Sequence, residues 1–134
     1  MEKTTVMAEF SIIGDDFVPQ NITNQLKITP EKYWIKGDVI KGKNIKRRET
    51  CWTISTGYEE SFDISQQLYK VVNLLTKKKN MLNQLKDQYK LEYLFSVVVK
   101  IENNEKPAMY FERDFIEFVN ELEAEIDIDL YIYS

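Results

Sequence analysis

Two aspartates near the end of the sequence have the type and spacing for carboxylate chemistry. Asp127 and Asp129 lie in the stretch IDIDLYIY at positions 126–133, where apolar and other residues alternate. In an extended strand, residues two apart project from the same face, so these carboxylates would lie about 7 Å apart. Such a pair could bind Mg²⁺ or Ca²⁺, or act as acid and base. We favour a solvent-facing strand side instead, because a single strand supplies too few convergent groups for a site.

Asp15, Asp16 and Cys51 are the other candidates for chemistry. The two aspartates stand between a predicted strand and a predicted helix, where they could hold a cation. Residues in such places more often close the turn and cap the helix. Cys51 stands beside Trp52 in a predicted strand, and the sequence contains no histidine to activate its thiol. We therefore predict no catalytic residue and no metal site.

The segment between Trp34 and Trp52 is rich in positive charge. Residues 27–48 include eight basic residues and two acidic residues. Cationic side chains beside a tryptophan could bind phosphate or nucleic acid, although the glycine pattern of a P-loop is absent. We favour an exposed, mobile loop at 41–46 whose ends are anchored by two mostly buried tryptophans. The candidate anion-binding residues are Lys36, Lys41, Lys43, Lys46, Arg47 and Arg48.

The C-terminal quarter carries the opposite charge. Residues 101–134 include ten acidic residues and two basic residues, so the basic segment and this acidic one could pair or could face different partners. The alternation at 126–132 predicts that the Ile and Leu side chains fill the core, so the intervening side chains must point elsewhere. Tyrosine is enriched at protein interfaces, and carboxylates beside it would steer a basic partner. We therefore predict a protein-binding surface formed by Asp127, Asp129, Tyr131, Tyr133, Glu121 and Glu125.

Composition limits the function classes further. The chain has 134 residues, a formal net charge of −4, one cysteine and no histidine. An intramolecular disulfide is impossible, and the commonest general base and zinc ligand are absent. The negative net charge argues against a general nucleic-acid binder. The sequence has no apolar signal-peptide core and no apolar run near the ~20 residues of a membrane helix, so we expect a cytoplasmic protein without cofactors or membrane contact.

Hydrophobic periodicity predicts the elements that position these residues. The composition and alternation of strands occur at residues 6–13, 50–56, 91–101 and 126–133, with a short returning strand at 107–111. Apolar residues at helical spacing predict helices at about 19–27, from 61 or 63 to 75, at about 77–89 and at 114–123. The stretch 91–101 is partly apolar on both faces, which is typical of a central strand.

The order of these elements predicts a single α+β domain over residues 1–134. Two β-α-β halves joined by a helix pair favour a ferredoxin-like split arrangement. We expect an antiparallel sheet with helices mainly on one face. The apolar stripe of the helix at 64–75 should pack on the strand at 91–101.

Four motifs along the chain resemble those of one protein family. They are FSIIGDDFVPQNIT at 10–23, ITPEKYWIKGD at 28–38, ETCWTISTGYEES at 49–61 and AEIDIDLYIYS at 124–134. In this order they resemble the bacterial family of unknown function DUF4279, over nearly the whole chain. The resemblance implies a single-domain α+β bacterial protein and supplies no activity. This chain has Lys77 where family members often carry Pro, so the break within the helix pair is not marked by a proline.

Three functions fit these residues. The first is a non-enzymatic bacterial binding protein, for example an immunity or antitoxin-like protein that masks a toxin domain. The second is a small-ligand or cation-dependent enzyme that uses Asp15, Asp16, Asp127 and Asp129. The third is a phosphate or nucleic-acid binder through the loop at 36–48. We favour a protein that binds a protein partner over an enzyme, because no catalytic constellation is complete; the sequence leaves the partner and the oligomeric state open.

Overall fold

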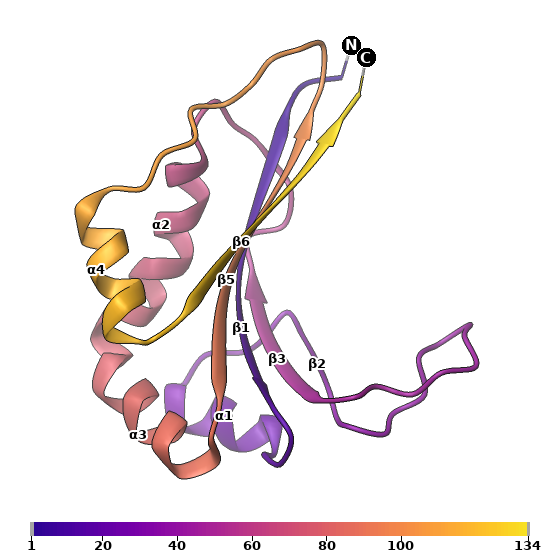
Figure 1. The fold of residues 1–134 in the computed structure, drawn as a ribbon, viewed down its shortest axis with the longest axis vertical. Helices are drawn as coiled ribbons and strands as arrows, with labels where there is room; N and C mark the ends of the chain where they lie inside the picture. The colour runs from indigo at the N-terminus through magenta and orange to yellow at the C-terminus, as the bar shows by residue number, and fades with distance from the viewer. Residues whose placement is uncertain (1, 134) are drawn as a thin grey trace.

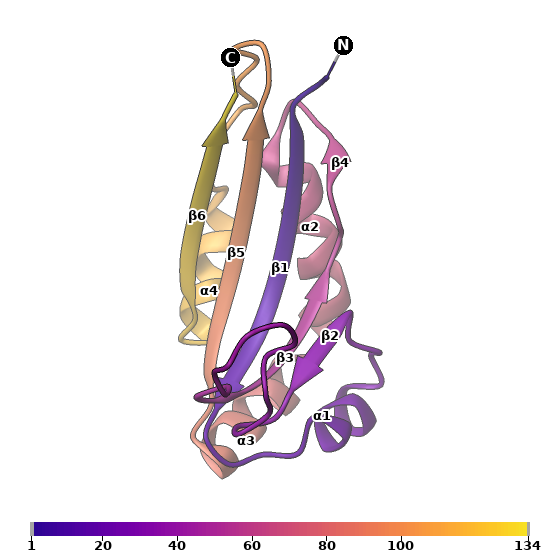
Figure 2. The ribbon, with the colours of Figure 1, turned by 90° about the vertical axis from the view of Figure 1, so that its right-hand side faces the viewer.

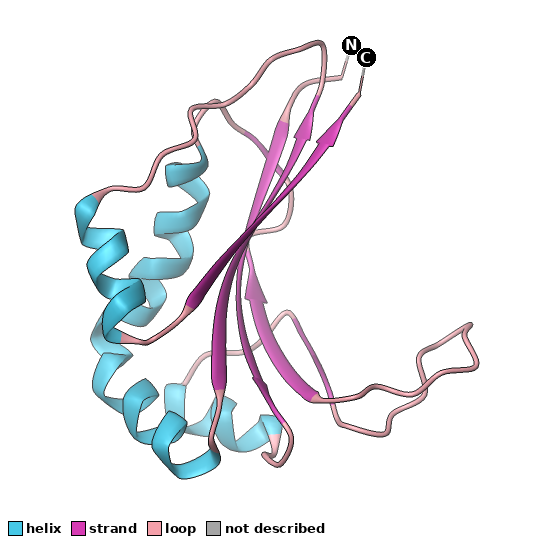
Figure 3. Cartoon of the chain, in the orientation of Figure 1, coloured by secondary structure: helices cyan, strands magenta, loops and turns pink. Residues whose placement is uncertain are grey.

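The computed structural model describes residues 2–133 and is an α+β fold built on a six-stranded sheet. The strands are β1 Thr5–Gly14, β2 Lys32–Trp34, β3 Thr50–Ser55, β4 Glu59–Glu60, β5 Glu92–Ile101 and β6 Glu125–Ile132. The helices are α1 Pro19–Leu26, α2 Ile64–Leu75, the 3₁₀ helix η1 Thr76–Lys78, α3 Lys79–Tyr89 and α4 Arg113–Glu121. All the helices lie on one side of the sheet, as Figures 1 and 3 show. The expected fold class and the one-sided helix layer are therefore confirmed.

The sheet is mostly antiparallel. Its strand order is β2-β3-β1-β5-β6, and β4 pairs with β1 beside β3. The long central strands β1 and β5 are antiparallel to each other, whereas β6 runs parallel to β5 after the crossover through α4. The ferredoxin-like split arrangement is not confirmed by this order. The structure does place β5 at the centre of the sheet, as its two partly apolar faces predicted.

The core lies between the helix layer and one face of the sheet. Every second residue of β1 and β5 faces the helices, so Phe10 and Phe95 are fully buried and lie with ring centroids 4.9 Å apart. The stripe of α2 is buried as predicted, but the strand that α2 lies closest to is β1, not the predicted strand at 91–101. The helix begins where the Asp63 carboxylate accepts a hydrogen bond from the Ser65 backbone amide at 2.9 Å. The helix pair is also confirmed, because η1 separates α2 from α3 without a proline.

The segment 107–111 is not a strand. Residues 102–112 instead leave β5 and cross toward α4 along the helix side, as Figure 1 shows. The segment makes one isolated bridge, between Ala108 and Asp63, in which the Ala108 amide donates to the Phe62 carbonyl at 2.7 Å. Pro107 has no backbone N–H to donate to a ladder, which disfavours a returning strand. The predicted hairpin at this position is therefore wrong.

The apolar side of β6 is less buried than its alternation predicted. Ile126 packs partly against the core, but the exposed fractions of Ile128, Leu130 and Ile132 are 41%, 43% and 67%. β6 is the last strand of the sheet, and in Figure 1 it starts near α4 and then diverges from it. Most of its apolar side is therefore not covered by a helix. The expectation that this whole side fills the core is wrong.

Candidate functional site

The acidic residues of β6 form one row on the sheet face that carries no helix. The parallel register sets Glu125, Asp127 and Asp129 beside Leu94, Ser96 and Val98 of β5, and Tyr131 beside Lys100. Because alternate strand residues share a face, the four β6 side chains project together, and all four are exposed. We call Glu125, Asp127, Asp129 and Tyr131 the acidic row. It lies along the free edge at the left of Figure 2.

The carboxylates of the acidic row are not neutralised within the chain. Among residues 2–133, no ion pair within 4 Å involves Glu125, Asp127 or Asp129. The nearest cation in register is Lys100, whose Nζ lies 3.8 Å from the ring centroid of Tyr58. The Asp129 carboxylate, as a hydrogen-bond acceptor and a negative charge, raises the pKa of Tyr131. The row is thus a strip of negative potential with an aromatic hydroxyl at one end.

Two residues that the sequence grouped with this row lie elsewhere. Glu121 is on α4 in the helix layer, where it forms an ion pair with Lys79. Tyr133 follows the end of β6, with its backbone amide bonded to the Ile101 carbonyl at 2.9 Å and its side chain 43% exposed. The structure therefore brings together Glu125, Asp127, Asp129 and Tyr131, keeps Tyr133 at the end of the strand, and separates Glu121 from them.

The uncovered sheet face beside the acidic row was not identified from the sequence. Toward β3 its polar groups satisfy one another: Ser11 and Thr53 share a hydroxyl hydrogen bond of 2.8 Å, and Lys32 lies 3.7 Å from Glu9. Toward β6 it carries the half-buried side chains of Leu94 and Val98 and then the acidic row. The sequence feature that could have indicated this face is the partly apolar second face of β5. The same pattern is equally typical of a face covered by helices.

The basic loop at 35–49 is a protruding, internally bonded hairpin. Val39 and Lys46 form an isolated bridge, and the Arg47 amide donates to the Asp38 carbonyl at 2.7 Å. The lysines at 41, 43 and 46 are exposed, as predicted, and no ion pair within the described residues involves them. Figure 1 shows this loop projecting from the helix-free side.

The two tryptophans differ in burial. Trp52 has no exposed surface, and its Nε1 donates to the Thr23 hydroxyl at 3.0 Å. Trp34 is only partly buried, and the Arg47 guanidinium lies 3.8 Å from the centroid of its ring. Of the expected pair of buried anchors, Trp52 is confirmed and Trp34 is not. Trp34 stays accessible because it belongs to β2, an edge strand of three residues.

The basic loop and the acidic row do not pair with each other. The loop follows β2 and precedes β3 at one edge of the sheet, and the row is on β6 at the other. The basic side chain at the base of the loop, Lys36, lies 3.7 Å from Asp15 instead. The sequence left open whether the two charged regions pair with each other or lie apart. In the structure they lie apart, at opposite edges of the sheet.

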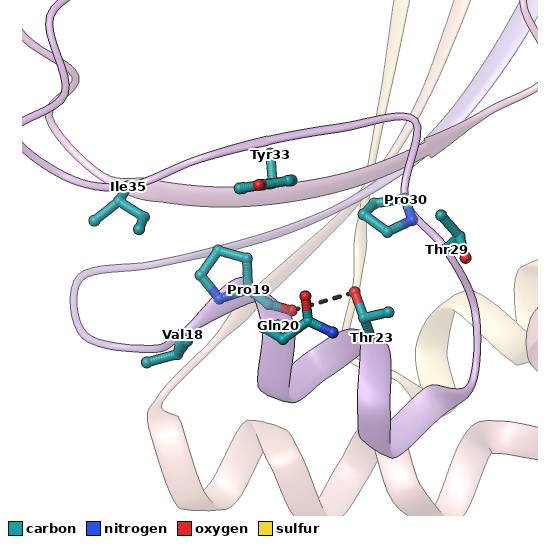
Figure 4. A pocket seen from close by; sticks show the side chains of 8 residues that line it. All are labelled: Val18, Pro19, Gln20, Thr23, Thr29, Pro30, Tyr33 and Ile35. Atoms are coloured by element: carbon teal, nitrogen blue, oxygen red, sulfur yellow. Dashed lines mark hydrogen bonds between the residues drawn. The ribbon is translucent and has the colours of Figure 1, made fainter.

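A cleft of about 530 Å³ lies between α1 and the segment that leads into β2. Figure 4 shows its walls, with Pro19 and Gln20 on the helix side and Pro30 and Tyr33 opposite. The Thr23 hydroxyl in this wall donates to the Pro19 carbonyl at 3.4 Å and accepts from the Trp52 indole, so both of its roles are occupied. No carboxylate, amine, guanidinium or thiol side chain lines the cleft, so its Thr and Tyr hydroxyls have no charged neighbour within the lining to activate them.

The carboxylates proposed for a cation-dependent enzyme are divided between two regions. Asp15 follows β1 at the end where Glu92 begins β5, whereas Asp127 lies beside Ser96, which pairs with Glu9. Six residues of strand between positions 9 and 15 correspond to about 20 Å. Within residues 2–133 no group of three or more His, Cys, Asp or Glu side chains could hold a metal ion.

Cys51 is a buried thiol of the sheet. Its side chain is 5% exposed, and its Sγ lies 3.3 Å from the Thr53 hydroxyl. Burial raises the pKa of this thiol, which keeps it protonated near neutral pH. The structural role predicted for Cys51 agrees with this environment.

Comparison with known proteins gives one match. A family model described as "Domain of unknown function (DUF4279)" matches residues 2–133 of the 134-residue chain. No curated protein matches, and no solved structure matches. In the described residues, no helix has both the length and the apolar character needed to cross a membrane.

Proposed function

We propose that this chain, which belongs to the DUF4279 family, is a non-enzymatic protein that binds a basic protein partner on the acidic row of β6. One observation carries the proposal. The carboxylates of Glu125, Asp127 and Asp129 are exposed, lack an intramolecular ion pair within residues 2–133, and lie on the helix-free face of the sheet. Like charges in a row repel one another, so a cationic partner would relieve an unfavourable arrangement.

The neighbours of the row support a protein partner over a small cation. Tyr131 and Tyr133 are 45% and 43% exposed, and tyrosine gives large contact area with a polar tip. Leu94 and Val98 provide half-buried apolar surface beside the row. An interface of this kind joins an apolar contact to a charged rim, and the charge increases the association rate with a basic partner.

The role that we propose is that of an immunity or antitoxin-like protein in the bacterial cytoplasm. A nuclease toxin binds a polyanion in a basic cleft, and an acidic protein surface of matching shape can occupy that cleft. The formal net charge of −4 favours such an encounter. The proposal needs no turnover, in keeping with the cleft at α1, whose lining has no carboxylate, amine, guanidinium or thiol side chain.

Affinity capture with charge-reversed variants tests the proposal. Wild-type protein and Asp127→Lys/Asp129→Lys are used as bait in lysate of the native bacterium, and a captured protein is then purified and its affinity measured directly. We expect a basic partner that loses at least tenfold in affinity with this variant and binds less tightly as salt rises. Asp15→Lys/Asp16→Lys is the matched control, because it makes the same charge change at exposed residues distant from the row.

Unchanged partner binding by the folded Asp127→Lys/Asp129→Lys variant would exclude the acidic row as the binding surface. A catalytic turnover that the same substitutions abolish would instead favour the enzyme hypothesis. Circular dichroism of each variant establishes that it is folded before it is used as bait.

A second candidate function is anion binding by the basic loop. The observation that favours it is the Arg47 guanidinium over the partly exposed Trp34 ring, next to exposed lysines with no ion pair in residues 2–133. Such a loop could contact phosphates of a nucleic acid. Binding of single-stranded RNA that falls steeply with salt and is lost in Lys41→Ala/Lys43→Ala/Lys46→Ala would support this function over the first.

A further inference from the structure

The outer edge of β6 lacks most of the features that usually protect an edge strand, and its charged side chains, Glu125, Asp127 and Asp129, all lie on the helix-free face. β6 is eight residues long, ends the sheet, and pairs with β5 without interruption from Glu125 to Ile132. Its sequence EIDIDLYI contains no proline, glycine, lysine or arginine. Edge strands are normally kept from pairing by short length, proline, lysine or a bulge. The free edge of β6, at the left of Figure 2, therefore presents backbone amides and carbonyls that another strand could pair with.

Three branched apolar side chains accompany this open edge. Ile128, Leu130 and Ile132 point to the helix side of β6 but are 41%, 43% and 67% exposed. They follow Ile126, the one apolar residue of β6 that packs partly against the core. A free strand edge with an uncovered apolar row beside it is the kind of surface on which one chain adds a strand to another.

We infer that β6 pairs antiparallel with β6 of a second copy of this chain, in a register centred on Leu130. The argument is the self-complementarity of the strand. Directly opposed side chains of an antiparallel pair project from the same face of the sheet. In a symmetric pair of β6 strands, apolar residues therefore oppose apolar residues only if the two-fold axis passes between a residue and its own copy. Centring on Leu130 sets Leu130 against Leu130 and Ile128 against Ile132 of the second copy, so all three exposed apolar side chains meet apolar partners.

The other face of the strand selects this register by charge. Centring on Leu130 sets Asp129 opposite Tyr131 and Asp127 opposite Tyr133 of the second copy, so no carboxylate directly faces another. Centring on Ile128 would oppose Asp127 to Asp129 twice, and centring on Asp129 would oppose the two Asp129 side chains. Like charges directly opposite each other destabilise a pair. A centre on Tyr131 avoids this repulsion as well but shortens the ladder.

The fold leaves room for this pairing. The overlap runs from Asp127 to Tyr133 and leaves out the start of β6, near which α4 lies, so the α4 helices of the two copies would lie toward the outer ends of the joined strands (Figure 1). The two-fold axis is perpendicular to the sheet, which keeps both helix layers on the same side. The two sheets then become one, and both acidic rows stay on the uncovered face. The inference uses the backbone edge and apolar side of β6 and does not rest on the proposed function.

Sedimentation velocity across a wide range of protein concentration tests the pairing. We expect wild-type protein to pass reversibly from monomer to dimer, and Leu130→Lys to remain monomeric because the two lysines would oppose each other. Ile116→Lys is the matched control: Ile116 is 52% exposed on α4, outside the proposed contact, and this variant should dimerise like wild type. A monomeric wild type at every concentration, or a dimer that survives Leu130→Lys in folded protein, overturns the inference.

Cysteine cross-linking tests the register. Directly opposed residues of an antiparallel pair have Cα atoms about 4.5–5.5 Å apart, which suits a disulfide. In a Cys51→Ala background, Leu130→Cys should form a disulfide-linked dimer under mild oxidation. Ile128→Cys alone should not, but a mixture of Ile128→Cys and Ile132→Cys should. Efficient self-linking by Ile128→Cys, or none by Leu130→Cys, contradicts the register.

Neutralisation of the carboxylates separates this inference from the proposed function. Asp127→Asn/Asp129→Asn removes two carboxylates without adding a lysine to the strand edge, so this variant should still dimerise while its affinity for the basic partner falls. Leu130→Lys should lose the dimer. If Asp127→Asn/Asp129→Asn abolished dimerisation as well, the pairing would depend on the carboxylates and the proposed register would be wrong.

Discussion

Replacement of Trp52 measures how much of the fold depends on one tryptophan. Trp52 is fully buried in the core, and its indole N–H bonds the Thr23 hydroxyl of α1. Truncation of a core tryptophan to alanine costs about 3–5 kcal/mol, because lost contacts and the resulting cavity add. Domains are stable by about 5–15 kcal/mol, so Trp52→Ala should remove a large share of the free energy of unfolding. Urea denaturation followed by circular dichroism measures the loss.

Trp34→Ala is the matched control for Trp52→Ala. Its ring is partly exposed and carries the Arg47 guanidinium on one face, an arrangement worth about 0.5–1 kcal/mol at exposed sites. The free energy of unfolding should therefore fall by about 1 kcal/mol or less. Equal losses for the two alanine variants would refute the assignment of Trp52 as the core anchor and Trp34 as a surface residue.

The indole hydrogen bond can be separated from the apolar burial. Thr23→Val leaves the buried Trp52 N–H without its acceptor, which should cost about 1–3 kcal/mol. In the Trp52→Phe background the same Thr23→Val change should cost less, because no N–H remains to be satisfied. Strictly additive losses in this double-mutant cycle would show that the contact between the two side chains does not contribute to stability.

Three further predictions follow from burial and charge. Lys41→Ala/Lys43→Ala/Lys46→Ala should change the free energy of unfolding by about 0.5 kcal/mol per site or less, because these side chains are exposed; a urea midpoint far below wild type would contradict this. The buried Cys51 thiol, whose pKa is raised by burial, should react slowly with Ellman's reagent in folded protein and rapidly in denaturant. Burial raises the pKa of Tyr69 to about 12 from an ordinary value of 10.0, so its neutral form stabilises the fold below pH 10 and this contribution is lost as the pH rises toward 12. Tyr69→Phe should flatten the decline of stability over that range, and an unchanged decline would count against the assignment.

Elements with long, regular periodicity could be predicted from the sequence. The stripe of α2 and the alternation of β1 and β5 each extend over ten residues or more, so propensity and burial agree along the whole element. Helix α1 could be placed because Pro19 suits a first helical position. β2 and β4 were missed because strands of three and two residues have no detectable period.

The wrong predictions about β6 and Glu121 have a common cause: which side of a strand a helix covers is determined by the tertiary fold, not by the local sequence. Alternation at 126–132 distinguishes two sides of β6 but does not reveal whether a helix lies over either side. The sheet ends at β6, and this strand starts near α4 and then diverges from it, so most of the apolar side is exposed where the pattern predicted a core. The same limit applies to Glu121, which is near the acidic row in sequence but belongs to the helix layer.

The location of the acidic row follows from the one-sided helix layer. Because all the helices lie on one face of the sheet, the other face is in contact with water. On its β1–β3 half, polar side chains on this face bond one another, through the Ser11–Thr53 hydrogen bond and the Glu9–Lys32 ion pair. The β6 end differs, because three carboxylates lie on one side of the strand and none of them forms an ion pair within residues 2–133. Stability alone gives no reason for that arrangement, since like charges in a row repel. The part of the face that the described chain leaves without ion pairs is therefore the part to which we assign the proposed partner, and it lies on β6, whose outer edge has no proline, lysine or arginine.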